Sequence, residues 1–547
     1  MNVAEYLLSR LKSLGVDHVF GIPGDYILPF FEVMEDSDVT HIAPCNELNG
    51  GYAADGYARL RGLSAVAVTY GPGSFSLVNA VAGAYAERAP VVVISGGPPT
   101  ELYESRPYMH HILPDNYEAS MRIFEQITVG ARVLKDAEAA PADIDELLRL
   151  CLAESRPVYL EIPRDVQLQD CAPPADWSVP ERRPKDAAAT EAAVELLTRR
   201  LSAADQCVLL VGHEIHSAGL QDDLLALVEK TGIPVSSMFS GKPEFLEHHP
   251  RCIGIYHGLG SLDAVREFVE GADAVVWLGA VPSDFNKGGS TAELSDAQSI
   301  VVFDDKVIAA EGAFAGVTIT DVVTGLLDGL PAGRWSDLEA PVHGFSHKAE
   351  HAYEPVPDQP MTNERFFARM ARFLQDGDVI FADAGPSINM AYVQLPPGSR
   401  YIASCYWASI GAGFGYTLGA CFAAAPDRRI IALEGDGAFQ MTAQELSTMI
   451  RYGKTPIVFV INNRGYTAER LIHDGPFNDI QNWRYHRLPE AFGGIVGEDV
   501  HTEGDLEAAL ERAAGHTGPG PLLIEVHLDP LDVPDAFERM SAGLRSR

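Results

Sequence analysis

The stretch that decides the fold runs from Arg429 to Gly465. It contains RIIALEGDGA at 429–438, a helical segment at 442–452, the apolar run IVFVI at 457–461 and NNRG at 462–465. Short apolar runs bounded by glycine and polar residues predict buried parallel strands, and the segment between them predicts a crossover helix. Because the carboxyl ends of parallel strands meet at one edge of a sheet, we expect Asp436 and Asn463 to lie close together.

Oxygen atoms of the ligand types that Mg²⁺ prefers can converge at this edge. Asp436 offers a carboxylate, Asn463 an amide oxygen and Gly465 a main-chain carbonyl. Mg²⁺ takes six oxygens and shares them with phosphates and water. A glycine-rich turn at a helix start also lets the backbone approach a phosphate, although such a turn alone is equally typical of tight chain reversals. The spacing therefore predicts a magnesium and phosphate site.

The alternation of short apolar strands and helices extends over the whole chain. Two Pro-rich polar stretches interrupt it, at Cys171–Pro184 and around His343–Pro360. We therefore predict an α/β fold with three doubly wound parallel-sheet domains. The predicted domains cover residues 1–172, 186–340 and 360–530, and a C-terminal helix or lid covers 531–547.

Composition and charge exclude several classes of protein. The chain has 547 residues, of which 46% are hydrophobic, and its 76 acidic and 41 basic side chains give a net charge of −35. Such a charge repels a phosphate backbone, so we expect no nucleic-acid partner. No apolar run is long enough to span a bilayer, and charged residues interrupt the first helix. Seven scattered cysteines fit a reduced compartment. We therefore expect a cytoplasmic protein without a membrane partner.

The turn GDG and the following asparagine pair resemble the magnesium-diphosphate signature of thiamine-diphosphate enzymes. The continuation NNRGYTAERLIHDGPFNDIQNW at 462–483 resembles the branch of 2-oxo-acid decarboxylases that act on pyruvate, indolepyruvate, phenylpyruvate or branched-chain substrates. The resemblance covers essentially the whole chain. It implies non-oxidative decarboxylation of a small-molecule 2-oxo acid to an aldehyde and CO₂, through a thiamine-diphosphate enamine and with Mg²⁺ as the metal.

The same resemblance assigns residues to the cofactor. Asp436, Asn463 and the Gly465 carbonyl would hold Mg²⁺. The Ala408 carbonyl would accept a hydrogen bond from the aminopyrimidine, and Ile410 would wedge the two rings into a bent shape. Relatives often have Gly-Thr-Ser where this chain has Gly385-Pro386-Ser387; proline has neither hydroxyl nor N–H, so a diphosphate contact there would fall to Ser387. The remaining diphosphate contacts are implied for Gly437 and Ala438.

Five side chains are implied as catalytic. Glu47 would share a proton with N1′ of the aminopyrimidine. The polar cluster that orients the substrate carboxylate and moves protons would contain Asp25, His110, His111 and Glu469. Without the resemblance, Glu47 could equally be a carboxylate that stabilises the first turn of a helix. The adjacent histidines could equally be polar residues of the protein surface. Because this family builds its site from domains of two subunits, the resemblance also implies a homo-oligomer, a dimer as the minimum and a tetramer as the fuller assembly.

A small residue in the segment Tyr466–Ile472 bears on the substrate. Pyruvate-preferring relatives typically carry isoleucine at the position of Ala468, and positions 468 and 472 share a helix face. We therefore predict a preference for branched-chain, long-chain or aryl 2-oxo acids over pyruvate. The predicted substrate pocket contains Ala468, Ile472 and the C-terminal lid residues Met540 and Leu544.

Two alternatives stay open. One is a thiamine-diphosphate carboligase of the acetohydroxyacid synthase type, and the other is a catalytically silent cofactor-binding protein. The pair His110–His111 together with Glu469 favours the decarboxylase over the carboligase, and the presence of Glu47 and Glu469 argues against a silent protein. A nicotinamide or flavin oxidoreductase is disfavoured because no convincing G-x-G-x-x-G follows a strand.

Overall fold

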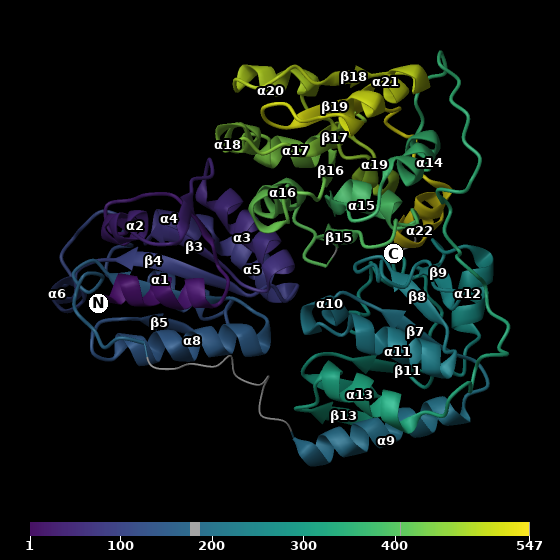
Figure 1. The fold of residues 1–547 in the computed structure, drawn as a ribbon, viewed down its shortest axis with the longest axis horizontal. Coiled ribbons are helices and arrows are strands. Elements are labelled where there is room, and N and C mark those ends of the chain that lie inside the picture. Colours follow the sequence, from purple (N-terminus) through teal and green to yellow (C-terminus); the bar gives the residue numbers. More distant parts are fainter. Residues whose placement is uncertain (175–185, 405, 546–547) are drawn as a thin grey trace.

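Three sheets, each covered by helices, make up the chain (Figure 1). The computed structural model describes residues 1–174, 186–404 and 406–545, except for the side chains beyond Ser541. The first unit, purple to blue, packs beside the third, green to yellow, and the teal central unit lies below the third. These three mostly parallel α/β units confirm the predicted fold class. The exact domain boundaries stay predictions, and most of the break predicted at Cys171–Pro184 lies outside the described residues.

The first sheet is entirely parallel, in the order β2-β1-β3-β4-β6-β5. Its central strands are buried on both faces, as their uninterrupted apolar runs require. Its strands are β1 (His18–Gly21), β2 (Thr40–Ile42), β3 (Ser64–Thr69), β4 (Val91–Gly97), β5 (Ala131–Val133) and β6 (Val158–Pro163). Its helices are α1 (Val3–Ser13), α2 (Leu28–Glu35), α3 (Glu47–Arg61), α4 (Pro72–Ser76), α5 (Val78–Ala86), α6 (Thr100–Ser105), α7 (Ala119–Phe124) and α8 (Ala140–Glu154).

The central sheet has the order β13-β12-β11-β10-β7-β8-β9, and its β11-β12-β13 edge is antiparallel. The predicted parallel sheet therefore carries an antiparallel edge. Its strands are β7 (Cys207–Val211), β8 (Val235–Met238), β9 (Cys252–Tyr256), β10 (Ala274–Leu278), β11 (Ser299–Val302), β12 (Lys306–Ala309) and β13 (Gly312–Ala315). Its helices are α9 (Ala187–Ala203), α10 (Glu214–Ala218), α11 (Gln221–Thr231), α12 (Asp263–Glu270) and α13 (Ile319–Gly329).

The third sheet is parallel, in the order β15-β14-β16-β17-β19-β18. The chain leaves β14 in one direction to β15 and then returns to β16 on the other side of β14, so the strand order reverses between β14 and β16. Such a switch point opens a crevice beyond the carboxyl ends of the two strands, where ligands bind in open α/β sheets. Its strands are β14 (Val379–Ala382), β15 (Arg400–Ala403), β16 (Ile430–Gly435), β17 (Ile457–Asn462), β18 (Glu498–Val500) and β19 (Leu522–His527).

Helices and short turns complete this third unit. One continuous helix was predicted over 442–452, but the chain forms two helices, α17 (Asp436–Thr442) and α18 (Glu445–Arg451). The helices are α14 (Asn363–Phe373), α15 (Ala384–Met390), α16 (Ala412–Ala423), α17 (Asp436–Thr442), α18 (Glu445–Arg451), α19 (Thr467–Ile472), α20 (Leu488–Ala491), α21 (Glu503–Ala514) and α22 (Asp535–Arg545), with 3₁₀ turns η1 (Pro476–Asn478) and η2 (Tyr485–Arg487).

The first and third units are joined by close packing of α3 against α16 (Figure 1). A Cβ atom on Gly419 would lie 1.9 Å from the Ala53 carbonyl oxygen, and one on Gly56 would lie 2.3 Å from that of Tyr416. Only glycine permits this approach of two backbones, because any side chain would force the helices apart. The glycines of both helices therefore determine how the units meet.

The C-terminal helix α22 packs against α19, at the boundary between the third and central units (Figure 1). Within the described part of the chain, no helix combines the length and apolar character needed to cross a bilayer.

Candidate active site

The loops that follow β16 and β17 bring three predicted ligands together. Asp436 is 1% exposed; its Oδ1 accepts from the Gly437 N–H at 2.7 Å, and its Oδ2 from the Gly465 N–H at 3.0 Å. Gly465 has φ +135°, and a Cβ there would lie 2.1 Å from the Asn478 carbonyl oxygen. Only glycine therefore fits, and it holds the second loop against the first.

The side-chain amide of Asn463 faces two oxygen atoms at this point. One end of the amide lies 3.0 Å from the Gly465 carbonyl oxygen and 3.3 Å from Asp436 Oδ1, and its other end lies 3.0 Å from Thr467 Oγ1. Without a cation the amide N–H group can donate to both oxygens, and with a cation among them the amide would turn its oxygen inward. A carboxylate, an amide oxygen and a carbonyl are ligands of the hard type that Mg²⁺ takes. These residues therefore fit a magnesium ion.

A cavity of about 390 Å³ opens in front of these oxygens. It lies at the switch point between β14 and β16 and is closed by residues of the central unit and of α22. Most of the residues predicted from the third unit line it. They are Ser387, Ala408, Ile410, Asp436, Gly437, Ala438, Asn463, Gly465, Ala468, Glu469, Ile472 and Met540.

Ala408 and Ile410, the two predicted cofactor contacts in the segment before α16, both line this cavity. Ala408 has φ +55°, a left-handed conformation that an alanine adopts only when its surroundings impose it. Ile410 keeps 38% of its surface exposed. Asp383, which the sequence interpretation missed, imposes the shape: its buried Oδ2 accepts from the N–H groups of Gly411 and Gly413, both at 2.9 Å. Burial raises the pKa of Asp383 to about 6, although main-chain N–H donors oppose the rise.

Glu87 is a second anchor that the sequence interpretation missed. This side chain of the first unit is 4% exposed. Its Oε1 accepts from the N–H groups of Tyr406 at 3.0 Å and Trp407 at 2.8 Å, and its Oε2 from Arg59 at 2.8 Å. One carboxylate thus ties the segment before α16 to the first unit of the same chain.

We expect Glu87→Gln to lower the midpoint of thermal unfolding. The amide keeps one acceptor but loses the charge that pairs with Arg59, and hydrogen bonds to a charged group contribute about 1.5–3 kcal/mol. A domain of this size shifts by roughly 2–4 °C per kcal/mol, so a drop of about 5 °C is expected. Differential scanning calorimetry measures it. Glu104→Gln, at an exposed position in α6, is the matched control; equal midpoints for the two variants would contradict the anchoring role.

Ser387 is placed less favourably than predicted. It lies buried in α15, and its Oγ donates to the Ala384 carbonyl oxygen at 2.8 Å. The hydroxyl proton is thus engaged within the helix and would have to turn to reach a phosphate. Pro386 lines the cavity beside it and offers no donor.

The helix α19 and the C-terminal helix form one wall of the cavity. Ala468, Glu469 and Ile472 line it from α19, and Met540 lines it from α22. Leu544 falls within α22, but its side chain lies outside the described residues. Three phenylalanine side chains that were not predicted contribute to the apolar lining, namely Phe239, Phe285 and Phe537.

Three members of the predicted polar cluster, Asp25, His110 and His111, lie together in the first unit, whereas the fourth, Glu469, lines the cavity of the third unit. His110 Nε2 lies 2.8 Å from Asp25 Oδ2, and the rings of His110 and His111 lie 4.4 Å apart between centroids. The Tyr70 hydroxyl donates to the His110 carbonyl oxygen at 2.9 Å and so holds the histidine loop. His110 and His111 are exposed, and Asp25 is half-buried.

Glu47 begins α3 and is half-buried. The preceding Asn46 caps the helix by accepting from the Asn49 N–H at 2.8 Å, and Asn49 donates to Glu445 of the third unit at 2.7 Å. The described residues that line the 390 Å³ cavity include neither Glu47 nor any member of the Asp25–His110–His111 cluster. One chain therefore does not bring the two halves of the predicted site together.

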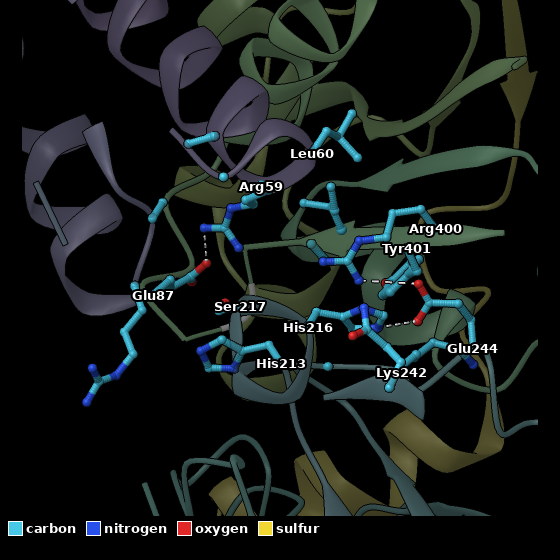
Figure 2. Close-up of a pocket in the computed structure, with 18 of the residues that line it drawn as sticks. Arg59, Leu60, Glu87, His213, His216, Ser217, Lys242, Glu244, Arg400 and Tyr401 are labelled. Carbon is cyan, nitrogen blue, oxygen red and sulfur yellow. Dashed lines mark hydrogen bonds and ion pairs between the residues drawn. The ribbon is translucent and has the colours of Figure 1, made fainter. Parts of the chain in front are cut away.

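A larger cavity, about 630 Å³, lies where the three units meet (Figure 2). Arg400 of β15 donates to Glu244 of the central unit at 3.2 Å, and His216 of α10 lies 2.9 Å from the other oxygen of that carboxylate. Arg59 and Glu87 face them from the first unit. Among the described residues that line it, none belongs to the predicted site, so its ion pairs serve to join the units.

Each of the three units matches a known protein family. Models of thiamine pyrophosphate enzymes match residues 1–119 as the N-terminal cofactor-binding domain, 194–316 as the central domain and 383–526 as the C-terminal cofactor-binding domain.

Curated proteins match along the full chain. A pyruvate decarboxylase of Aspergillus fumigatus is 34% identical over 100% of this chain and 97% of its own. An alpha-keto-acid decarboxylase of Mycobacterium tuberculosis is 36% identical over 97% of this chain and 95% of its own. Pyruvate decarboxylase 1 of Oryza sativa is 36% identical over 94% of this chain and 86% of its own.

Proposed function

Because this chain belongs to the thiamine pyrophosphate enzymes, in the family of the pyruvate and alpha-keto-acid decarboxylases, we propose that it converts a 2-oxo acid to an aldehyde and CO₂ without an oxidant. The observation that carries the proposal is the convergence of the Asp436 carboxylate, the Asn463 side-chain amide and the Gly465 carbonyl at the ends of β16 and β17. It stands in front of a cavity large enough for a small-molecule substrate. Release of one aldehyde per CO₂ by the holoenzyme tests this function.

The third unit would hold the cofactor and its metal. Asp436, Asn463 and the Gly465 carbonyl would ligate Mg²⁺, and Gly437 and Ala438 would contact the diphosphate through their backbone. Ala408 and Ile410 would orient the cofactor rings. Thiamine diphosphate, when bound, supplies the electron sink that lets CO₂ leave a 2-oxo acid.

The protons are moved by side chains of this chain. Glu469 lines the cavity beside Ala468, where it can hold a proton near the substrate carboxylate. Asp25 and the hydrogen-bonded His110, with the His111 ring beside them, form a group with the composition of a proton relay. Glu47 would hold the proton shared with N1′ of the aminopyrimidine.

The separation of these groups within one chain supports a homodimer. A second copy would bring its Glu47 and its Asp25–His110–His111 cluster to the cavity of the first, and the first would do the same for the second. Exposed apolar side chains border the cavity, with Tyr406 at 45%, Trp407 at 43% and Ile410 at 38% exposure. A partner that covers them would gain the free energy of apolar burial. Pairing of dimers into a tetramer remains part of the proposal.

Co-expression of two inactive variants tests the shared site. If each site combines Glu47 of one copy with Asp436 of the other, a hybrid of Glu47→Gln and Asp436→Ala chains carries one intact site. A doubly tagged preparation, which retains the hybrids, is then expected to show about half of the wild-type activity. If each chain builds its own site, every site carries one substitution, and hybrids as inactive as the parents would contradict the proposal.

The carboligase alternative has less support. His110 stands beside Asp25 at hydrogen-bonding distance, and the His111 ring lies next to that of His110. This arrangement is expected for protonating a product rather than for admitting a second carbonyl substrate. Both curated groups named above are decarboxylases.

We further propose a preference for larger substrates over pyruvate. The relatives are named for pyruvate in some cases and for alpha-keto acids in general in others. The proposal therefore depends on the cavity wall that α19 forms. Ala468 lines the cavity there, together with Ile472, Phe537 and Met540. Each substrate methylene that is buried against such a wall contributes about 0.8 kcal/mol, close to a fourfold gain in affinity.

Ala468→Ile is expected to shift the selectivity toward pyruvate. Isoleucine adds three carbons to the wall, which shortens the space for a branched or aryl side chain while leaving room for a methyl group. The ratio of kcat/KM for 4-methyl-2-oxopentanoate over that for pyruvate should fall by at least about tenfold. Leu471→Ile, on the same helix but outside the residues lining the cavity, is the control. An unchanged ratio in Ala468→Ile would show that this wall does not set specificity.

A further inference from the structure

A second group of metal-ligand side chains lies on the outer edge of the third sheet, beside strand β18 (Figure 1). The parallel register of β18 with β19 pairs Asp499 with Glu525 and Val500 with Val526. Residues 501 and 527 follow next in this register. Because side chains two positions apart in a strand point to the same face, Asp499, Glu525, His501 and His527 form a two-by-two grid on one face of the sheet.

The distances within this grid are those of a coordination site. Asp499 Oδ1 lies 2.7 Å from His527 Nε2 and 3.3 Å from His501 Nε2. The two imidazole rings are parallel within 8°, with centroids 4.0 Å apart. Ligands of a tetrahedral Zn²⁺ ion, bound at about 2.0–2.1 Å, are themselves roughly 3.3 Å apart. Small side-chain rotations would therefore complete the geometry.

His486 and the buried grid member Glu525 hold the other side chains from the interior. His486, which belongs to η2, has its Nδ1 2.6 Å from Glu525 Oε2 and 3.6 Å from Asp499 Oδ1. Glu525 is 1% exposed and is also fixed by the Asn462 side-chain amide, which donates to its Oε1 at 2.6 Å. Such outer carboxylates and histidines orient the ligands of metal sites and tune their affinity. Asp499 and His501, in contrast, are 43% and 58% exposed, which leaves the site open to solvent.

The donor set distinguishes this group from the one at Asp436. Three oxygens suit Mg²⁺, whereas imidazole nitrogens with one carboxylate suit Zn²⁺ and neighbouring first-row transition metals. We propose that Asp499, His501 and His527 bind a divalent transition-metal ion of the zinc class, with His486 and Glu525 behind them. The open position would be filled by water.

Isothermal titration of Zn²⁺ into tag-free holoenzyme tests this proposal. The protein is first passed over a chelator and then saturated with thiamine diphosphate and Mg²⁺, so that the Asp436 site is filled. We expect one Zn²⁺ per chain in the wild type. His501→Asn changes an exposed side chain and should weaken binding at least about tenfold, and Asp499→Asn should do the same. His351→Asn, an exposed histidine remote in sequence, should bind like the wild type.

Three outcomes would overturn the proposal. The wild type could take up no Zn²⁺ at micromolar concentration, the His501→Asn variant could bind as the wild type does, or His351→Asn could lose binding to the same extent. Circular dichroism of each variant shows whether it is folded. As an independent measurement, Zn²⁺ should raise the thermal midpoint of the wild type but not that of His501→Asn.

Discussion

Replacing Asp436 by alanine is expected to weaken thiamine-diphosphate binding at least about a hundredfold at fixed Mg²⁺. Asp436 supplies the only carboxylate among the three groups that converge at this loop, the others being the Asn463 amide and the Gly465 carbonyl. Without it, the amide of Asn463 and the carbonyl of Gly465 would have to hold a divalent cation without any charge of opposite sign. The diphosphate would then enter the cavity with its charge poorly compensated. Isothermal titration calorimetry measures the affinity directly.

A matched acidic residue nearby controls for general charge effects. Asp474 follows α19 and is exposed, so Asp474→Ala should bind the cofactor as the wild type does. The far-ultraviolet circular dichroism of Asp436→Ala should match that of the wild type. Undiminished cofactor affinity in Asp436→Ala would remove the metal assignment for this loop.

The second large effect is expected at Glu47. Glu47→Gln retains the size of the side chain but cannot share a proton with N1′ of the aminopyrimidine. Proton transfer by a positioned group contributes about 10²- to 10⁴-fold. Exchange of the C2 proton of bound thiamine diphosphate with solvent should therefore slow by about a thousandfold. Quenched-flow NMR in D₂O measures this rate without turnover of substrate.

Cofactor binding distinguishes this role from a structural one. Glu47 begins α3, whose capping depends on Asn46 and not on Glu47, so Glu47→Gln should keep the cofactor affinity within a few-fold of the wild type. Glu35→Gln, exposed at the end of α2, should exchange at the wild-type rate. If Glu47→Gln also exchanged at that rate, another side chain would be the activating base.

The metal loop could be predicted from sequence because its ligands follow two strands of one βαβ unit. Asp436 and Asn463 stand directly after β16 and β17, and neighbouring parallel strands bring such positions together. Glu87 and Asp383 could not be found in this way. Both act by accepting main-chain N–H groups of residues 406–413, and any sequence offers such donors, so no side-chain motif marks the partner.

The differences from the predicted elements have similarly local causes. Strands β12 and β13 are short and largely exposed, so they lack the apolar run that marks a buried strand. The helix predicted over 442–452 begins earlier, at Asp436, and is interrupted near Ala443 and Gln444. Apolar periodicity does not register such a break, because both halves present apolar residues to the same core.

The sequence also does not reveal whether the Glu47 and Asp436 of one active site belong to the same subunit or to two. Glu47 and Asp436 both belong to recognisable motifs. The residues that line the cavity around Asp436, however, come from the third unit with its helix α22 and from the central unit. Sequence patterns specify the groups that belong to a site, whereas their assembly depends on the packing of whole units such as α3 on α16.

The balance of products from the holoenzyme tests the proposed function most directly. The enzyme, saturated with thiamine diphosphate and Mg²⁺, is supplied with 4-methyl-2-oxopentanoate without an electron acceptor, and CO₂ and 3-methylbutanal are quantified together. The proposed decarboxylation predicts one aldehyde for each CO₂, and loss of both products in Asp436→Ala. A carbon–carbon coupled product in place of the free aldehyde, or no CO₂ from any 2-oxo acid of a panel that includes pyruvate, would contradict it.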